Sequence, residues 1–228
     1  MSARNFVIGV DVGGTFTDLF FLDEQSGRAF TRKTPSTPSN QAVGFLEGIG
    51  SGVDDLSTIA TVIHGTTVGT NALLERKGAK AGVITTKGFR DVLEMRRRDR
   101  PETWGLWGSF DPVVARDRRV EVCERTLADG QVHTAVDPEE VKQAAKLLLE
   151  RGAESICIFF INAYANAENE QAALAAVKEV WPNDYINASS DILPEIREFE
   201  RASTTALNAY LQPPVGKYLK NLDNSLTD

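Results

Sequence analysis

Residues 7–27 have the sequence VIGVDVGGTFTDLFFLDEQSG. Two apolar runs, rich in Val, Ile, Phe and Leu, flank the short segment DVGGTFTD, which has two aspartates, two glycines and two threonines. Such runs are typical of strands, so the sequence predicts strands over 6–12 and 18–23 joined by a tight turn. A carboxylate and a Gly-Gly pair are unusual in a core hairpin. They raise the question of what Asp11, Gly13 and Gly14 face.

The turn DVGGTFTD suits a metal-bound triphosphate. Its glycines let backbone N–H groups come close to an anion, and the hydroxyls of Thr15 and Thr17 add donors. Asp11 cannot ligate phosphate, because like charges repel, but it can hold the hydrated Mg²⁺ that accompanies ATP. The alternative is an ordinary tight hairpin in which Gly, Asp and Thr satisfy the turn itself. The turn has neither the P-loop pattern nor GxGxxG, so the residues alone leave both interpretations open.

Composition excludes several classes of function. The chain has 228 residues, enough for one large domain or two lobes. Its net charge of −7 and pI near 5.0 provide no basic field for nucleic acid or an anionic membrane. The densest apolar run, 156–161, is far too short to span a membrane, and residues 1–5 do not resemble a signal peptide. Cys123 and Cys157 form neither a disulfide framework nor a metal motif, so we expect a cytoplasmic protein.

The remaining pattern alternates strands and helices. A third, more polar strand is predicted over 28–34, so three strands precede the first helix, which argues against a plain Rossmann unit. Further strands are predicted at 60–65, 81–86, 155–160 and 184–189, and helices after Ser39 and at 66–78, 137–151, 166–180 and 195–211. The predicted fold class is α/β, with a mixed sheet, flanking helices and an inserted α+β segment.

The segment 88–135 differs from its surroundings and is interpreted as an insertion. Its second part, 118–136, is predicted to be a hairpin with Asp129-Gly130 at the turn. The chain then divides into a core at 1–87, the insertion, and a remainder at 136–228. The last helix, 195–211, is expected to stop at Pro213-Pro214. It is also expected to carry surface i,i+4 charge pairs among Glu195, Arg197, Glu198, Glu200 and Arg201. As an alternative, one or two of these charges serve an interdomain cleft.

A second candidate site lies in VIHGTTVGTN, residues 62–71. Gly65, Thr66 and Thr67 fall between a predicted strand end and a helix start, where N–H groups suit an anion or a developing oxyanion. The alternative is that a threonine only caps the helix. His64, at the end of the same strand, is a candidate catalytic residue, although a lone histidine there is more often structural.

The segment RRRDRPETWGLWG, residues 96–108, suggests substrate binding. Arg97 and Arg98 have the chemistry to clamp a carboxylate, phosphate or bicarbonate, and Trp104 and Trp107 to wall an aromatic substrate. The alternative is a solvated face followed by a loop whose tryptophans pack on the core or against a partner subunit.

Three blocks, IGVDVGGTFTD (8–18), HGTTVGTNALLERKGAKAGVITTKGFRDVLEMRRRDRP (64–101) and LPEIREFERASTTALNAYLQP (193–213), resemble the hydantoinase A/5-oxoprolinase family. That family includes subunits of acetone and acetophenone carboxylases. The resemblance implies the first lobe of an actin-like ATPase with a ribonuclease H-like fold. It implies ATP and Mg²⁺ or Mn²⁺ as cofactors, with the nucleotide at Gly13–Thr17, including Phe16, and at Gly65–Thr67. Asp11, Thr17 and His64 would then be catalytic, and Asp11 and Asp18 would hold the metal.

The resemblance further implies phosphorylation of a carbonyl-derived oxygen of an amide, imide or ketone, followed by hydrolysis or carboxylation. The segment RRRDRPETWGLWG resembles the carboxylase-like members of the family more than the oxoprolinases. The resemblance therefore favours a ketone carboxylase, such as an acetophenone carboxylase-like enzyme, over a ring-opening hydrolase of the hydantoinase or 5-oxoprolinase type. Family subunits are much longer, with a second actin-like half. We therefore expect this chain to be a truncated piece, a proteolytic fragment or a natural short subunit, inactive alone. Its expected partners are that second half and another large subunit. The competing class is a non-catalytic structural subunit.

Overall fold

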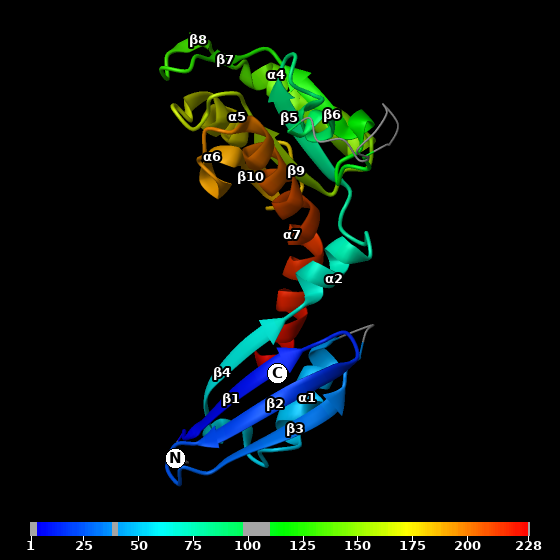
Figure 1. Cartoon of the computed structure of the whole chain (residues 1–228), viewed down its shortest axis with the longest axis vertical. Coiled ribbons are helices and arrows are strands. Elements are labelled where there is room, and N and C mark those ends of the chain that lie inside the picture. Colours follow the sequence, from blue (N-terminus) through cyan, green and yellow to red (C-terminus); the bar gives the residue numbers. More distant parts are fainter. Residues whose placement is uncertain (1–3, 38–40, 98–109, 228) are drawn as a thin grey trace. The chain divides into compact units, whose positions relative to one another are not determined.

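The computed structural model describes residues 4–37, 41–97 and 110–227. They form two compact units, one of Met1–Lys77 with Pro214–Asp228 and the other of Gly78–Pro213. Each unit has its own four-stranded sheet with flanking helices (Figure 1), and the predicted α/β fold class is confirmed. The boundaries of these two units differ from those of the three segments expected from the sequence. The division into three segments stays a prediction.

The first unit is built on a mixed sheet in the order β3-β2-β1-β4. Its elements are β1 (Phe6–Val12), β2 (Phe16–Asp23), β3 (Ala29–Pro35), α1 (Gln41–Gly50), η1 (Leu56–Thr58), β4 (Ile59–Thr66), α2 (Val68–Leu74) and the last part of α7 (Glu198–Thr227). Strands β1 and β2, and β2 and β3, are antiparallel, whereas β1 and β4 are parallel. The predicted opening of three strands before the first helix is confirmed.

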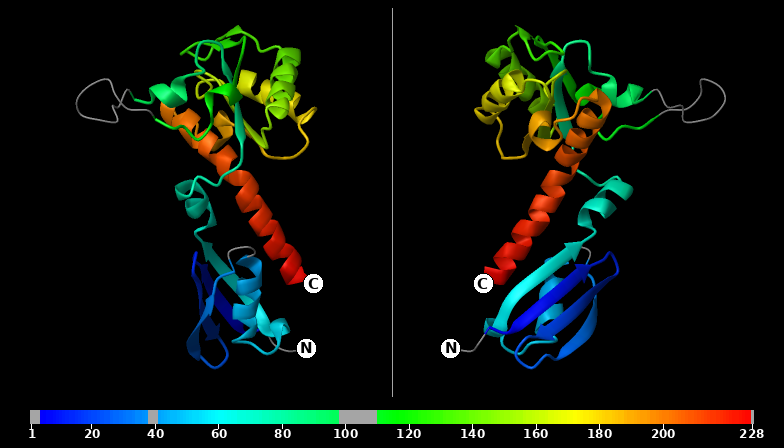
Figure 2. Two further views of the ribbon diagram at one scale, coloured as in Figure 1. Left: turned by 90° about the vertical axis from the view of Figure 1, so that its right-hand side faces the viewer. Right: turned by 60° about the vertical axis from the view of Figure 1, so that its left-hand side comes forward.

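The two-residue alternation of β1 and β2 assigns the faces of this sheet. Ile8 and Val10 of β1 and Leu19 and Phe21 of β2 are buried and pack with α1 on one face (Figure 2). The helix approaches closely, because a Cβ at Gly48 would lie 2.7 Å from a methyl carbon of Leu19. The other face of the sheet carries exposed side chains and forms the candidate site described below.

The second unit contains a parallel sheet in the order β10-β9-β5-β6. Its elements are β5 (Ala81–Thr86), α3 (Val92–Met95), η2 (Arg116–Arg118), β6 (Arg119–Val122), β7 (Arg125–Thr126), β8 (Val132–Thr134), α4 (Pro138–Glu150), β9 (Ser155–Phe159), α5 (Glu168–Lys178), β10 (Ile186–Ala188), α6 (Ser189–Ile192) and the first part of α7. Every residue of β5 and β9 is buried, as expected for central parallel strands.

Helix α4 follows its sequence signals. The Asp137 side chain accepts a hydrogen bond from the Glu139 N–H at 2.9 Å, Pro138 occupies the first turn, and Gly152 after the helix has a φ of 76°. Helix α2 is shorter than predicted: it ends at Leu74, and Arg76, expected in its last turn, has a left-handed φ of 56°.

The segment interpreted as an insertion contributes to the main sheet of the second unit. Strand β6 pairs in parallel with β5 and was not predicted as a sheet strand. The predicted hairpin is confirmed in shorter form, because β7 pairs with β8 across a turn in which Gly130 has a φ of 87°.

The predicted end of the last helix at Pro213-Pro214 is wrong, because α7 continues to Thr227. Proline lacks an N–H, so the carbonyls of Ala209 and Tyr210, four residues earlier, lose their usual helical partners. Other donors replace them: the Ser155 hydroxyl bonds the Ala209 carbonyl at 2.6 Å, and the Ala79 N–H bonds the Tyr210 carbonyl at 2.9 Å. The usual penalty of proline inside a helix is thereby reduced. Of the helices in the described ranges, none has the length and apolar character needed to cross a membrane.

The expectation of surface charge pairs on this helix is wrong for Arg201. Its side chain is fully buried, and its guanidinium donates to the Ser189 hydroxyl at 3.1 Å, the Glu195 carbonyl at 2.6 Å and the Phe160 carbonyl at 2.8 Å. Arg197, by contrast, is exposed, as expected.

Candidate functional site

The glycine turn is a tight connection between β1 and β2. The Gly13 N–H donates to the Phe16 carbonyl at 3.0 Å, next to the paired residues Val12 and Thr17. A Cβ at Gly13 would lie 2.9 Å from that carbonyl oxygen, so a side chain would displace the turn. The requirement for glycine at this position is therefore explained by the hairpin, as the alternative interpretation proposed. At Gly14 the added Cβ would meet only the Asn71 side-chain nitrogen, at 3.6 Å.

Thr17 supports this turn from the covered face of the sheet. Its side chain is fully buried, and its hydroxyl lies 3.1 Å from that of Ser36. The Ser36 hydroxyl donates to the Gly13 carbonyl at 2.8 Å, so the Thr17 hydroxyl is left to donate to Ser36. The structure does not bring Thr17 to the same side as Asp11. The expectation that its hydroxyl meets a phosphate stays a prediction. Ser36 was not predicted from the sequence.

Asp11 and Asp18 face each other on the exposed side of the same sheet. They are paired residues of antiparallel strands, and Asp11 is also paired with Gly65 of the parallel strand β4. Side chains directly opposite each other on antiparallel strands have Cβ atoms roughly 5 Å apart. Both aspartates are exposed. Gly65 leaves space beside Asp11, because its added Cβ would lie 3.7 Å from the nearer carboxylate oxygen.

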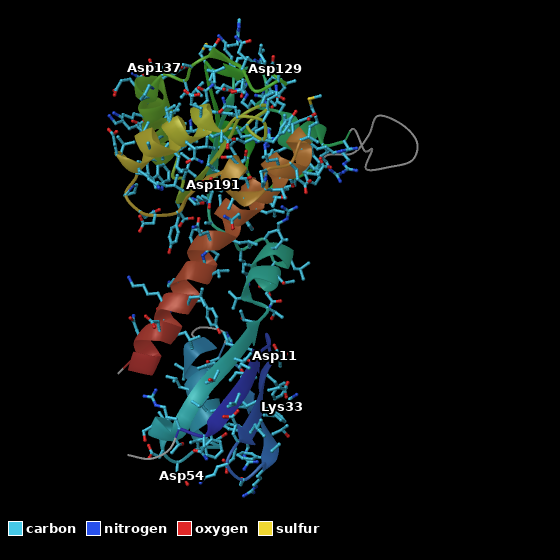
Figure 3. The ribbon with its side chains drawn as sticks, turned by 90° about the vertical axis from the view of Figure 1, so that its left-hand side faces the viewer. Asp11, Lys33, Asp54, Asp129, Asp137 and Asp191 are labelled. Atoms are coloured by element: carbon cyan, nitrogen blue, oxygen red, sulfur yellow. The ribbon has the colours of Figure 1, made fainter. Side chains whose placement is uncertain are left out.

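Lys33 completes this charged group and was not predicted. It is paired with Asp18 in the β2–β3 register, and its Nζ lies 3.0 and 3.2 Å from the two carboxylate oxygens of Asp18. Figure 3 shows Asp11 and Lys33 on this sheet, with Asp54 in a loop away from them. The two-residue alternation of the third strand would have placed Lys33 on this face, had the strand register been known.

An open hollow of about 810 Å³ lies over the exposed face. Its lining includes Asp11, Asp18, Lys33 and the backbone at Gly9 and Gly65. Two large apolar side chains also line it and remain 48% and 62% exposed, those of Phe20 and Ile63. The hollow therefore combines carboxylates, a cation and apolar walls, the mixture expected of a small-molecule site.

His64 lies on the covered face, so the structure does not bring it to Asp11. Its register partner on β1 is the core residue Val10, and its Nε2 shares a hydrogen bond with the hydroxyl of Tyr218 on α7. The Phe45 ring packs edge-on against the His64 ring, with 5.2 Å between the ring centroids. Burial lowers the pKa of His64, against opposing effects of the Val10 backbone and the Asp11 charge. This placement favours the structural alternative for His64.

The second glycine-threonine turn lies beside the first. The Thr67 N–H bonds the Val12 carbonyl at 3.4 Å, and Asn71, near Gly14, donates from its side chain to the Thr67 hydroxyl at 3.1 Å. The Thr66 hydroxyl accepts from the Val68 N–H at 3.2 Å, so this threonine supports the start of α2. The structure thus brings together the two segments predicted to contact phosphates.

The residues predicted to bind substrate are only partly described. Arg97 pairs with Glu200 through its Nε. Arg98, Trp104 and Trp107 lie outside the described residues, and their role stays a prediction.

The exposed carboxylates fit a phosphate-bound magnesium ion. Mg²⁺ is usually held by one or two carboxylates together with waters and substrate phosphates. Within the described ranges, no three His, Cys, Asp or Glu side chains are grouped as an all-protein metal site would require. Two carboxylates, those of Asp11 and Asp18, lie on the exposed face of the sheet.

Comparison with known proteins supports the resemblance seen in the sequence. The chain is 39% identical, over 96% of its length, to an uncharacterized protein of Methanocaldococcus jannaschii, of which it covers 33%. It is 32% identical, over 98% of its length, to caprolactamase subunit alpha of Pseudomonas jessenii, of which it covers 34%. A solved structure of acetone carboxylase in its nucleotide-free form matches with a TM-score of 0.83 and 30% identity, over 98% of this chain and 34% of the other.

The chain spans about a third of the length of these three relatives. A family model described as the hydantoinase/oxoprolinase N-terminal region matches residues 7–181, most of the chain. The chain therefore belongs to the hydantoinase/oxoprolinase family.

Proposed function

We propose that this chain supplies the phosphate-binding part of an ATP-dependent carboxylase or amide hydrolase, as the first lobe of an actin-like ATPase. The observation that carries the proposal is the pair Asp11 and Asp18 on an exposed sheet face, on either side of the turn through Gly13 and Gly14. The solved relatives named for ATP-dependent acetone carboxylation and as an ATP-dependent caprolactamase support it.

Each part of the site has a separate role in this proposal. Asp11, beside the open space at Gly65, holds the hydrated Mg²⁺ or Mn²⁺ of the nucleotide. The exposed backbone of Gly14 and Thr15 directs N–H groups toward the phosphates. Thr17, together with Ser36, keeps the turn in shape from the covered face. ATP, when bound, supplies the phosphoryl group that activates a substrate carbonyl oxygen.

The substrate is proposed to be a small amide, imide or ketone. Carboxylation of a ketone is the first candidate, supported by the acetone carboxylase match and by the arginines and tryptophans of 96–107. Ring-opening hydrolysis is the second candidate, and the 32% sequence identity to caprolactamase subunit alpha favours it. Both candidate reactions use the same phosphate-binding part, so the geometry of the site in the first unit fits both of them equally.

The complete active unit is proposed to need more protein than this chain. The chain covers about a third of relatives that are named as subunits, which supports a second actin-like half and another large subunit as partners. Residues 1–228 alone are then expected to show no ATP turnover, because half a site neither positions a triphosphate nor excludes water.

The experiment compares Asp11→Asn with Asp54→Asn, which removes an exposed aspartate of the same unit away from the hollow (Figure 3). Mg–ATP is titrated into the isotope-labelled chain, and the backbone amide shifts of residues 11–18 and 65 are followed by NMR, which detects millimolar binding. We expect these shifts to move in the wild type and in Asp54→Asn but not in Asp11→Asn. Unmoved amides in the wild type would contradict the nucleotide site.

In the complete enzyme, Asp11→Ala is expected to abolish ATP turnover while the protein remains folded. If the chain were instead a structural subunit, the variant would assemble and the complex would turn over at the wild-type rate. Normal turnover would therefore favour the non-catalytic alternative.

A further inference from the structure

Two cations line the hollow, and they lie on opposite faces of β3. Lys33 is paired with Asp18 on the exposed face. Arg32 is paired with the core residue Leu19. The Arg32 guanidinium lies 5.1 Å over the Phe30 ring and donates to its neighbour's carbonyl at 3.1 Å. Of these two residues, Lys33 is the one whose side chain faces the carboxylates.

The ion pair of Lys33 with Asp18 is weak enough to exchange. Both side chains are more than half exposed, 57% for Lys33 and 59% for Asp18. Exposed pairs of this kind contribute about 0–1 kcal/mol, because water and salt screen them. The Nζ also lies 5.1 Å from the Phe16 ring centroid, at the edge of the glycine turn. Lys33 is thus held beside the turn without being fixed to Asp18.

Charge balance decides which groups a metal–triphosphate would meet. With Lys33 on Asp18, Asp11 is the aspartate of the pair whose charge is not neutralised. A cation binds such a site less well than it would bind two available carboxylates. Phosphate oxygens near the turn would offer the ammonium group a more strongly charged partner than one exposed carboxylate.

We propose that Lys33 contacts the phosphate oxygens of the bound metal–triphosphate, and that Asp18, released from Lys33, then joins Asp11 at the cation. A flexible stem that carries a compact charge suits this exchange, as in other lysines that bind phosphate. The inference rests on the proposed function. It adds a residue that nothing in the glycine turn predicts and assigns a use to the ion pair.

The proposed exchange predicts that removing the Lys33 charge changes the dissociation constants for Mg–ATP and for Mg²⁺ alone in opposite directions. In Lys33→Gln, the dissociation constant for Mg–ATP should rise about tenfold, the loss expected for one charged hydrogen bond. The dissociation constant for Mg²⁺ alone should fall, because the positive charge that competes with Mg²⁺ for Asp18 has been removed. Arg28→Gln removes the same charge from an exposed residue just before β3 that does not line the hollow, and both constants should stay within about twofold of the wild type.

Both probes are followed by the amide shifts of residues 11–18 and 65 in the 228-residue chain. Lys33→Arg keeps the positive charge and should restore most of the Mg–ATP affinity. Because Lys33 is exposed, the variants are expected to fold; if Lys33→Gln did not, Lys33→Ala removes the same charge and serves for both titrations. A wild type that responds to Mg–ATP, with Lys33→Gln binding it equally well, would overturn the role of Lys33 and leave the proposed function standing. A wild type that does not respond to Mg–ATP would overturn both.

Discussion

The sheets of the two units carry their charged side chains in opposite ways. In the first unit, Asp11, Asp18 and Lys33 lie exposed on one face of the sheet. In the second unit, Glu170 and Arg201 are completely buried beside the parallel sheet. Both groups combine acidic and basic residues, so residue type alone does not separate them. The difference lies in what each side chain contacts.

The buried charges of the second unit are surrounded by protein donors and acceptors. The Glu170 carboxylate accepts hydrogen bonds from the Phe160 N–H, the Ser190 N–H and the Ser189 hydroxyl, at 2.6 to 2.8 Å. The Ser189 hydroxyl also accepts from Arg201 and so connects the two charged residues. Such a buried set, hydrogen-bonded within the protein, is best explained as structure. The exposed set of the first unit has capacity left for a ligand, which is why we place the function there.

Arg201→Ala is the variant with the largest expected effect, and it tests whether the buried charges of the second unit stabilise the fold. Removing one member of a buried charged network usually costs about 3–5 kcal/mol, because its partners stay buried without compensation. We expect the free energy of unfolding of the second unit to fall by that amount. The measurement is urea denaturation, with Arg197→Ala, an exposed arginine four residues earlier, as the control that should change it by less than about 0.5 kcal/mol. A loss below about 1 kcal/mol for Arg201→Ala would mean that the buried network is not a stabilising feature.

Local patterns predicted most of the secondary structure. The strands of the first hairpin, the buried strand at 81–86 and the capped helix α4 depend on short-range signals, and they were predicted to within a few residues. The continuation of α7 through Pro213-Pro214 depends on donors from Ala79 and Ser155, which are far away in the sequence. Strand β6 likewise pairs with a strand more than thirty residues earlier. Single-sequence patterns do not contain such long-range partners.

The candidate site was predicted in part for the same reason. Asp11 and the glycine turn are contiguous, and their position at a strand end was visible in the sequence. Which face each side chain occupies depends on register, and this separates Thr17 and His64 from Asp11 although all three were expected together. Lys33 reaches the site through pairing between β2 and β3, so proximity in the chain gave no signal for it.

A second test concerns pH and Glu124, a buried carboxylate of the second unit. The side chains of Thr86 and Asn169 donate to it, yet burial has the larger effect and raises its pKa above the ordinary value of 4.5. The folded state therefore binds the proton more tightly than the unfolded state. The stabilising contribution is complete below the ordinary pKa and is lost as pH rises through the folded-state pKa.

Glu124→Gln removes this titration. Between pH 4 and pH 8, the difference in unfolding free energy between variant and wild type should shift in favour of the variant as pH rises. Urea denaturation at several pH values measures this difference, from which other titrating groups cancel. Glu150→Gln, at an exposed position at the end of α4, is the matched control. A difference independent of pH would indicate that Glu124 titrates as an exposed glutamate does.

The smallest expected effect belongs to the exposed group of the first unit, in Asp11→Asn. Like charges directly opposite on antiparallel strands destabilise by about 0.2–1 kcal/mol, so removing one of them should leave the unfolding free energy unchanged or raise it by less than about 1 kcal/mol. Urea denaturation measures this, with Asp54→Asn as the matched control. The same substitution should remove the response to Mg–ATP, because a neutral amide cannot replace the carboxylate at the cation. A stability loss above about 1 kcal/mol would show that Asp11 supports the hairpin itself. It would contradict the view that the charged side chains of the first unit are available for a ligand. Unchanged stability with lost binding would mean that Asp11 is retained for a ligand at a small cost to the fold.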